Sequence, residues 1–151
     1  MDLTLRPYRD PDDRAAFFAL YQAVYQRPYG GGGGQADSLF DWMYRQSGDG
    51  RVLSTGAFDG DTLASFYGIV PVRMRVDGKD VMGAQSLDSM THPSYQRRGL
   101  FAKLGHLAYR ETCKDIPVVY GFPNESALPP RAARLGWVTL RPVPRFVLLL
   151  K

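Results

Sequence analysis

The residues best suited to chemistry lie between Ser89 and Lys103. An apolar, strand-like segment runs to Pro93, a basic turn Gln-Arg-Arg-Gly follows at 96–99, and a helical pattern begins at Leu100. A tight loop between a strand and a helix directs backbone N–H groups and the positive end of the helix dipole towards one point. The stretch therefore predicts an anion site with phosphate as its ligand. An ordinary basic connection between a strand and a helix is the alternative.

This stretch resembles the phosphate-binding motif of the GNAT acyltransferase superfamily, which reads Gln/Arg-x-x-Gly-x-Gly/Ala after a strand that ends in His-Pro. Gln96, Gly99 and the tripeptide at 91–93, Thr-His-Pro, match this pattern. Phe101 departs from it, because the pattern has Gly or Ala there, and Ala102 follows one residue late.

A second segment supports the resemblance. Residues 121–125 read Gly-Phe-Pro-Asn-Glu and residues 135–137 read Leu-Gly-Trp. They are similar to the family's second cofactor segment, in which an Asn opens a helix and Leu-Gly-aromatic ends it.

The resemblance implies that acyl-CoA is the co-substrate and that no metal is needed. Its pantetheine arm is expected along one strand, its pyrophosphate on the amides of residues 97–102, and Asn124 on the other side of the arm. Lys103, Arg131 and Arg134 are candidates for the 3′-phosphate. The cofactor-binding residues implied in this way are Ser89, Met90, Thr91, Gln96, Arg97, Arg98, Gly99, Leu100, Phe101, Ala102 and Asn124.

Transfer of an acyl group to an amine also needs a proton acceptor. Deprotonating an ammonium with a pKa near 10 at pH 7 costs about 4 kcal/mol. Asp88 lies in an otherwise apolar part of its strand, just before the cofactor segment, and burial there raises a carboxyl pKa towards a useful range. We expect Asp88 to be the general base, with Ser86 on the same face as a relay. A structural aspartate that binds loop amides is an equally weighted alternative.

The leaving thiolate has no obvious proton donor. The family's usual general acid is a tyrosine about four residues before the glycine of Leu-Gly, but that position holds Ala132, and no tyrosine lies between Asn124 and Gly136. Losing a general acid slows such a step by about 10²–10⁴-fold. Tyr120 and Tyr95 are the nearest substitutes, and Tyr120 is the expected catalytic candidate. A degenerate domain that binds acyl-CoA without turnover is the competing hypothesis.

The hydrophobic pattern predicts one α/β domain over residues 1–151. Pro71 predicts a bend or bulge in its strand, and five consecutive glycines at 30–34 predict a flexible connector. The expected strands are 3–6, 51–58, 62–76, 80–90, 118–122, 138–140 and 145–150, and the expected helices are 13–26, about 38–43, 99–113 and 124–135. This order matches the GNAT order, which implies a mixed, mostly antiparallel sheet of six to seven strands with a splayed parallel pair and about four helices.

Composition restricts the partners. The 44% hydrophobic and 23% charged residues are ordinary for a soluble globular chain, and no apolar run approaches a membrane span. The net charge of +4 is dispersed, with Arg97-Arg98 as the only adjacent basic pair, which argues against a nucleic-acid partner.

A single cysteine, Cys113, excludes an intrachain disulfide and predicts a cytoplasmic setting. We expect a small-molecule amine acceptor near Trp42, Tyr44, Phe66 and Tyr67, and a homodimer is left open.

Overall fold

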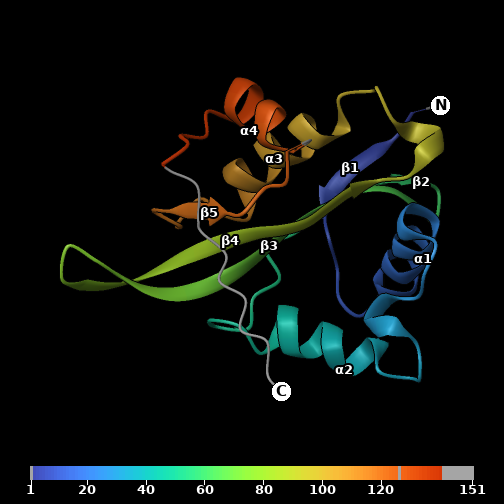
Figure 1. The fold of residues 1–151 in the computed structure, drawn as a ribbon, viewed down its shortest axis with the longest axis horizontal. Coiled ribbons are helices and arrows are strands. Elements are labelled where there is room, and N and C mark those ends of the chain that lie inside the picture. The colour runs from blue at the N-terminus through green and yellow to red at the C-terminus, as the bar shows by residue number, and fades with distance from the viewer. Residues whose placement is uncertain (1, 126, 141–151) are drawn as a thin grey trace, which may run out of the picture.

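The structure, a computed structural model, describes residues 2–125 and 127–140. Its centre is a sheet with the strand order β1-β2-β3-β4-β5, antiparallel throughout except for the parallel pair β4–β5 (Figure 1). The strands are β1 (Thr4–Pro7), β2 (Thr55–Asp59), β3 (Thr62–Val76), β4 (Lys79–Thr91) and β5 (Val119–Gly121). The expected mixed, mostly antiparallel sheet with a parallel pair is confirmed.

The expected count of six to seven strands is wrong for the described residues, which form five. Residues 138–140 form no strand: Val138 and Leu140 are 81% and 91% exposed, and no described strand pairs with them. The expected strand at 145–150 lies outside the described residues. The strand expected at 51–58 begins only at Thr55, and the residues before it are irregular.

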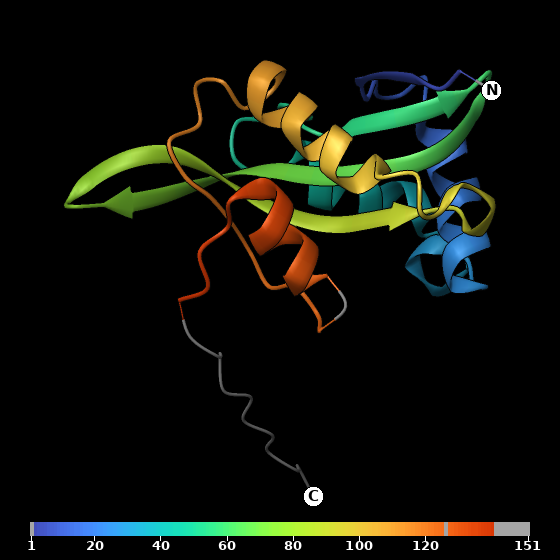
Figure 2. The ribbon, with the colours of Figure 1, turned by 90° about the horizontal axis from the view of Figure 1, so that it is seen from above.

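Two helical layers enclose the sheet, with α1 and α2 on one face and α3 and α4 on the other (Figures 1 and 2). The helices are α1 (Arg14–Tyr25), α2 (Ala36–Phe40), which continues as one π-helical turn (Asp41–Arg45), α3 (Leu100–Glu111) and α4 (Leu128–Leu135). The expected four helices are confirmed. Short 3₁₀ turns lie at Tyr29–Gly31 and Pro93–Tyr95.

The two faces of the sheet have different cores. Aromatic side chains dominate the core beneath α1 and α2, where the Phe17 ring lies 4.9 Å from the Phe66 ring and 5.1 Å from the Phe40 ring. Aliphatic side chains dominate the core beneath α3, where Leu100, Leu104 and Leu107 repeat at helical spacing. The sheet is therefore buried on both faces, as a mixed sheet covered by helices requires.

A β-bulge interrupts the pairing of β3 with β4. Phe66 pairs with Met90 and Gly68 pairs with Leu87, so Tyr67 faces two residues of β4, Asp88 and Ser89. Asp88 has φ +45°, in the left-handed region that non-glycine residues seldom occupy. Gly68 is required opposite, because a Cβ there would overlap the Leu87 carbonyl oxygen.

The irregularity of β3 was expected at Pro71, but this expectation is wrong. Pro71 pairs in register with Ala84 within an uninterrupted strand. Pairing of β3 with β2 ends at Tyr67, so at the buried Pro71 no described strand pairs with the side of β3 that faces away from β4. A residue without an N–H group is tolerated at such an edge, where none of the described strands needs its hydrogen bond.

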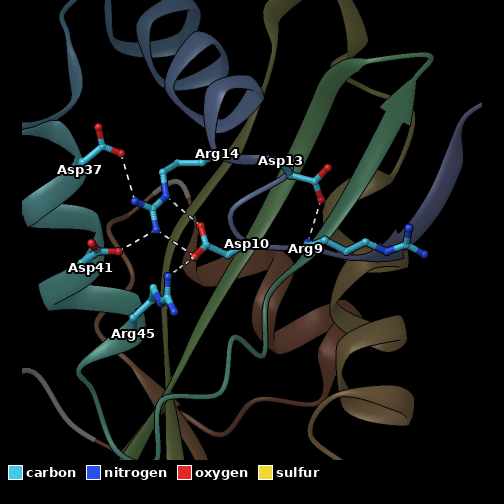
Figure 3. Close-up of polar contacts among 7 residues, drawn as sticks. All are labelled: Arg9, Asp10, Asp13, Arg14, Asp37, Asp41 and Arg45. Atoms are coloured by element: carbon cyan, nitrogen blue, oxygen red, sulfur yellow. Dashed lines mark hydrogen bonds and ion pairs between the residues drawn. The ribbon is translucent and has the colours of Figure 1, made fainter.

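A network of ion pairs holds α1 against α2 and the π-helical turn (Figure 3). The Arg14 guanidinium donates to Asp10 at 2.8 and 2.9 Å, to Asp41 at 2.6 Å and to Asp37 at 3.0 Å. The Asp10 side chain is only 2% exposed, and Arg45 is its second cation at 3.4 Å. Hydrogen bonding to Asp10 is the main reason why the pKa of Arg14 is raised.

Loss of the Arg14 charge should destabilise the protein. In Arg14→Gln the buried Asp10 carboxylate keeps only the more distant Arg45, so we expect the free energy of unfolding to fall by about 3 kcal/mol. Arg51→Gln is the matched control, because Arg51 is 41% exposed and its ion pairs with Asp49 and Asp115 lie at the surface, where such pairs are worth about 0–1 kcal/mol. Urea unfolding of both variants measures the difference, and equal losses would contradict a structural role for the network.

Candidate functional site

A pocket of about 330 Å³ opens at the end of β4, between the start of α3 and α4. All residues of the basic turn line it, together with residues from β4 and α4. The lining residues are Thr91, Tyr95, Gln96, Arg97, Arg98, Gly99, Leu100, Phe101, Ala102, Pro130 and Arg134. The structure therefore gathers the stretch predicted to bind phosphate around one cavity.

The loop has the geometry of an anion site. Gly99 is the N-cap of α3 with φ +71°, and no side chain caps this helix. The first N–H groups of a helix have no intrahelical acceptor, so here they remain directed at the pocket. The Tyr95 hydroxyl fixes the loop by donating to Asp59 at 2.7 Å, and the Arg98 guanidinium lies over the Tyr95 ring.

The next part of the site is a free strand edge. The pairing of β4 with β5 ends at Ser86↔Gly121, so residues 87–91 of β4 have no strand partner on that side among the described residues. These residues lead directly to the pocket, because Thr91 lines it. Across the gap, the Asn124 side chain accepts a hydrogen bond from the Ala127 N–H in the turn before α4. An extended ligand with hydrogen-bonding amides would fit along this edge.

Asp88 lies beside the free edge on the face of α1 and α2. Its carboxylate accepts a hydrogen bond of 3.0 Å from the Tyr44 hydroxyl, and Tyr44 is fully buried. Burial raises the pKa of Asp88, and the Tyr44 hydrogen bond opposes part of that increase. The expected rise in this pKa is thus present, and its cause is desolvation.

The charge of this carboxylate also acts on two more tyrosines. Burial is the main cause of the raised pKa values of Tyr25 and Tyr29, and the negative charge of Asp88 adds to both. Sequence reasoning missed these two hydroxyls and the role of Tyr44 as the direct partner of Asp88. The four-residue spacing of Tyr21, Tyr25 and Tyr29 was the available signal.

Ser86 lies on the opposite face from Asp88, so the expectation of a shared face is wrong. The bulge adds one residue to β4, and this addition turns Asp88 towards Tyr44 while Ser86 and Ser89 turn towards α4. Both serine hydroxyls lie 3.4 Å from Arg131 Nη2. Arg131 is 4% exposed and does not line the pocket, whereas Arg134 does, which disfavours Arg131 as the residue for an exposed 3′-phosphate.

The remaining residues predicted from sequence, Tyr120 and the aromatic acceptor residues, do not gather at one site. The Tyr120 hydroxyl donates to Gln85 Oε1 at 3.1 Å, and no contact joins it to Asp88. The aromatic acceptor site expected from sequence is wrong for Phe66 and Tyr67, because these two side chains are buried in different cores. Trp42 is 61% exposed. Within the described residues, no three His, Cys, Asp or Glu side chains are grouped to hold a metal ion, and no helix is long and apolar enough to cross a membrane.

Known proteins share this fold. An acetyltransferase of Trypanosoma brucei superimposes with a TM-score of 0.70 at 19% identity, covering 97% of this chain and 100% of that chain. An aminoglycoside 6′-N-acetyltransferase of Acinetobacter haemolyticus gives 0.65 at 11% identity, covering 98% and 99%. The aminoglycoside enzyme AAC(6′)-Iy, solved with a bisubstrate analogue of CoA and acetylneamine, gives 0.70 at 14% identity, covering 99% and 100%.

A search of curated protein sequences found no significant match. The family model of the GNAT acetyltransferase domain matches residues 4–139, which include the sheet, all four helices and the basic loop. The resemblance read from the sequence is thereby confirmed, and the chain belongs to the GNAT acetyltransferase family.

Proposed function

We propose that this protein transfers an acetyl or short acyl group from acyl-CoA to the amine of a small molecule. One observation carries the proposal: the basic loop pocket continues directly into a free edge of β4, and a buried carboxylate lies beside that edge. A phosphate cradle, an extended groove and a proton acceptor then follow one another within residues 88–102.

The basic loop and the strand edge supply the binding energy for acyl-CoA. The first-turn amides of α3, with Arg97 and Arg98, bind the pyrophosphate, and Arg134 lies on the other wall of the pocket. The unpaired backbone of residues 87–91 hydrogen-bonds the amides of the pantetheine arm. These contacts place the thioester beside Asp88.

Asp88 prepares the amine. Its carboxylate takes the proton that the amine loses as the C–N bond forms, and a pKa raised by burial suits this task near neutral pH. Tyr44 holds the carboxylate in place through its hydrogen bond. The acceptor reaches Asp88 from the face of α1 and α2, where Tyr25 and Tyr29 lie nearby.

The residues near Asp88 bear on the class of acceptor. Aminoglycoside acetyltransferases are among the similar structures, and they support an amine acceptor in general. The negative charge of Asp88 raises the pKa values of Tyr25, Tyr29 and Tyr44, and Arg27 has the opposite effect on Tyr25. We therefore propose a small amine of low charge, which aromatic side chains contact through its apolar part.

Binding of CoA at the basic loop can be tested with Gly99→Asp. This change places a carboxylate in the proposed phosphate cradle, so we expect CoA affinity to fall by about 100-fold or more, with a weaker salt dependence. Gly78→Asp is the matched control, because Gly78 also has a positive φ and open space around it but lies in the β3–β4 turn. Titration calorimetry measures both variants, and unchanged affinity in Gly99→Asp would remove the basis for this site.

Asp88→Asn tests the proton acceptor. Turnover should fall by about 10²–10⁴-fold and the acidic limb of the pH profile should vanish, while CoA affinity is retained. Because the folded-state pKa of Asp88 is raised, its charged form destabilises the fold as pH rises through that pKa. The variant should therefore be at least as stable as the wild type at pH 7. Asp80→Asn is the control, since Asp80 is an exposed aspartate in the same strand. Normal turnover in Asp88→Asn would make Asp88 structural.

Tyr44→Phe tests the hydrogen bond to the base. This bond stabilises the carboxylate, so its loss should raise the pKa of Asp88 further and move the acidic limb of the rate profile to higher pH by about one unit. Tyr8→Phe is the control, because it removes a buried hydroxyl from the same aromatic core without contact to Asp88. If the acidic limb of the rate profile does not move in Tyr44→Phe, the pKa of Asp88 does not determine that limb.

A further inference from the structure

Arg131 is a buried cation without an anionic partner among the described residues. Its side chain is 4% exposed, and none of the ion pairs in the described chain includes it. The Nε atom is buried with no hydrogen-bond acceptor. The remaining polar contacts are long, at 3.4 Å each, to two serine hydroxyls and the Ala127 carbonyl oxygen.

Two aromatic rings hold this guanidinium in position. Its Cζ lies 5.0 Å from the centre of the Phe101 ring and 5.5 Å from that of Trp137. Phe101 thus has a structural use at the position where it departs from the family motif. Such contacts offset part of the desolvation of a cation, but a buried charge without a counterion remains costly. The group is therefore prepared for an anion that binds there.

The position of Arg131 relative to β4 and the pocket restricts which part of a bound ligand could be this anion. Ser86 and Ser89, its hydroxyl contacts, flank Asp88 in the sequence, yet they face α4 while Asp88 faces Tyr44. Arg131 and Asp88 therefore lie on opposite faces of the same short segment of β4, where the strand edge has lost its partner. Ser89 is two residues from Thr91 at the pocket, a distance of about 7 Å along a strand. Arg131 does not line the pocket where the phosphates are expected.

We propose that Arg131 stabilises the thiolate of CoA as it leaves, an assignment that rests on the proposed function. The amine attacks the acyl carbon and forms the C–N bond, and its proton passes to Asp88. The C–S bond breaks and its electron pair goes to sulfur, which lies against the guanidinium. The thiolate takes a proton from solvent after release, and Asp88 returns its proton to solvent.

This role accounts for the absence of a tyrosine in α4. The position expected for it holds Ala132, which is exposed and has no group that donates a proton. Arginine stays charged at neutral pH and is not a proton donor in this range, so it acts by its charge and its N–H groups. In a site with little water, such an interaction is worth more than in solution.

Binding measurements with CoA and desulfo-CoA test the proposal without any acceptor amine. The free thiol of CoA is neutral near pH 7, and a site that stabilises the thiolate lowers the pKa of this thiol in the complex. CoA affinity relative to desulfo-CoA should then rise between pH 6 and pH 9, by about tenfold for each unit by which the pKa falls. We expect at least a tenfold rise for the wild type and a nearly constant ratio for Arg131→Gln.

Further variants make the outcome decisive. Arg131→Met replaces the cation by an apolar chain of similar length, which suits a buried site if the Gln variant fails to fold. Arg131→Lys keeps the charge and should keep part of the rise. Arg110→Gln is the control, because Arg110 is an exposed arginine that pairs with the adjacent Glu111, and it should behave as the wild type. With an active acceptor, Arg131→Met should lower kcat by about 10²-fold with a smaller change in KM.

The binding measurements distinguish a failure of the role of Arg131 from a failure of the proposed function. A constant ratio in the wild type, or the same rise in the wild type and in Arg131→Met, would overturn the role of Arg131 while leaving CoA binding intact. A wild-type protein that binds neither CoA nor desulfo-CoA would overturn the proposed function itself.

Discussion

The bulge at Asp88 is the constraint on which the site depends. One additional residue on β4 opposite Tyr67 reverses the alternation of side chains along the strand. Without it, Asp88 would share a face with Ser86 and point towards α4. With it, the carboxylate faces the aromatic core of α1 and α2, and the Ser89 hydroxyl faces Arg131. The free edge of β4 is thereby flanked by a carboxylate on one face and by a cation on the other.

This arrangement is costly, and the rest of the fold must support it. Asp88 has a left-handed backbone and a desolvated carboxylate, and Arg131 is a buried charge. The Arg14 ion pairs fix the π-helical turn that carries Tyr44, and tightly packed rings around Phe17 hold that turn on the sheet. Local destabilisation at a functional site, supported by a rigid surrounding, is a common balance between stability and activity.

Local patterns predicted much of this fold. The bounds of β3 and the start of α3 follow from hairpin turns and from Leu100, Leu104 and Leu107. The basic loop that lines the pocket follows from a glycine and two arginines between a strand and a helix. The faces of Ser86 and Asp88 could not be predicted, because a bulge depends on how β3 packs across from β4. The contacts of Arg131 and Tyr44 could not be predicted either, because their partners are remote in sequence. Arg131 contacts serines 42 and 45 positions away, and Tyr44 contacts an aspartate 44 positions away.

A crystal structure with bound CoA tests the central claim most directly. We predict that the pantetheine arm lies along the unpaired edge of β4 at residues 87–91, with its sulfur between the Asp88 carboxylate and the Arg131 guanidinium and its pyrophosphate on the first turn of α3. A CoA molecule bound elsewhere, or a sulfur atom remote from both side chains, would contradict the proposal that the bulge organises a transfer site.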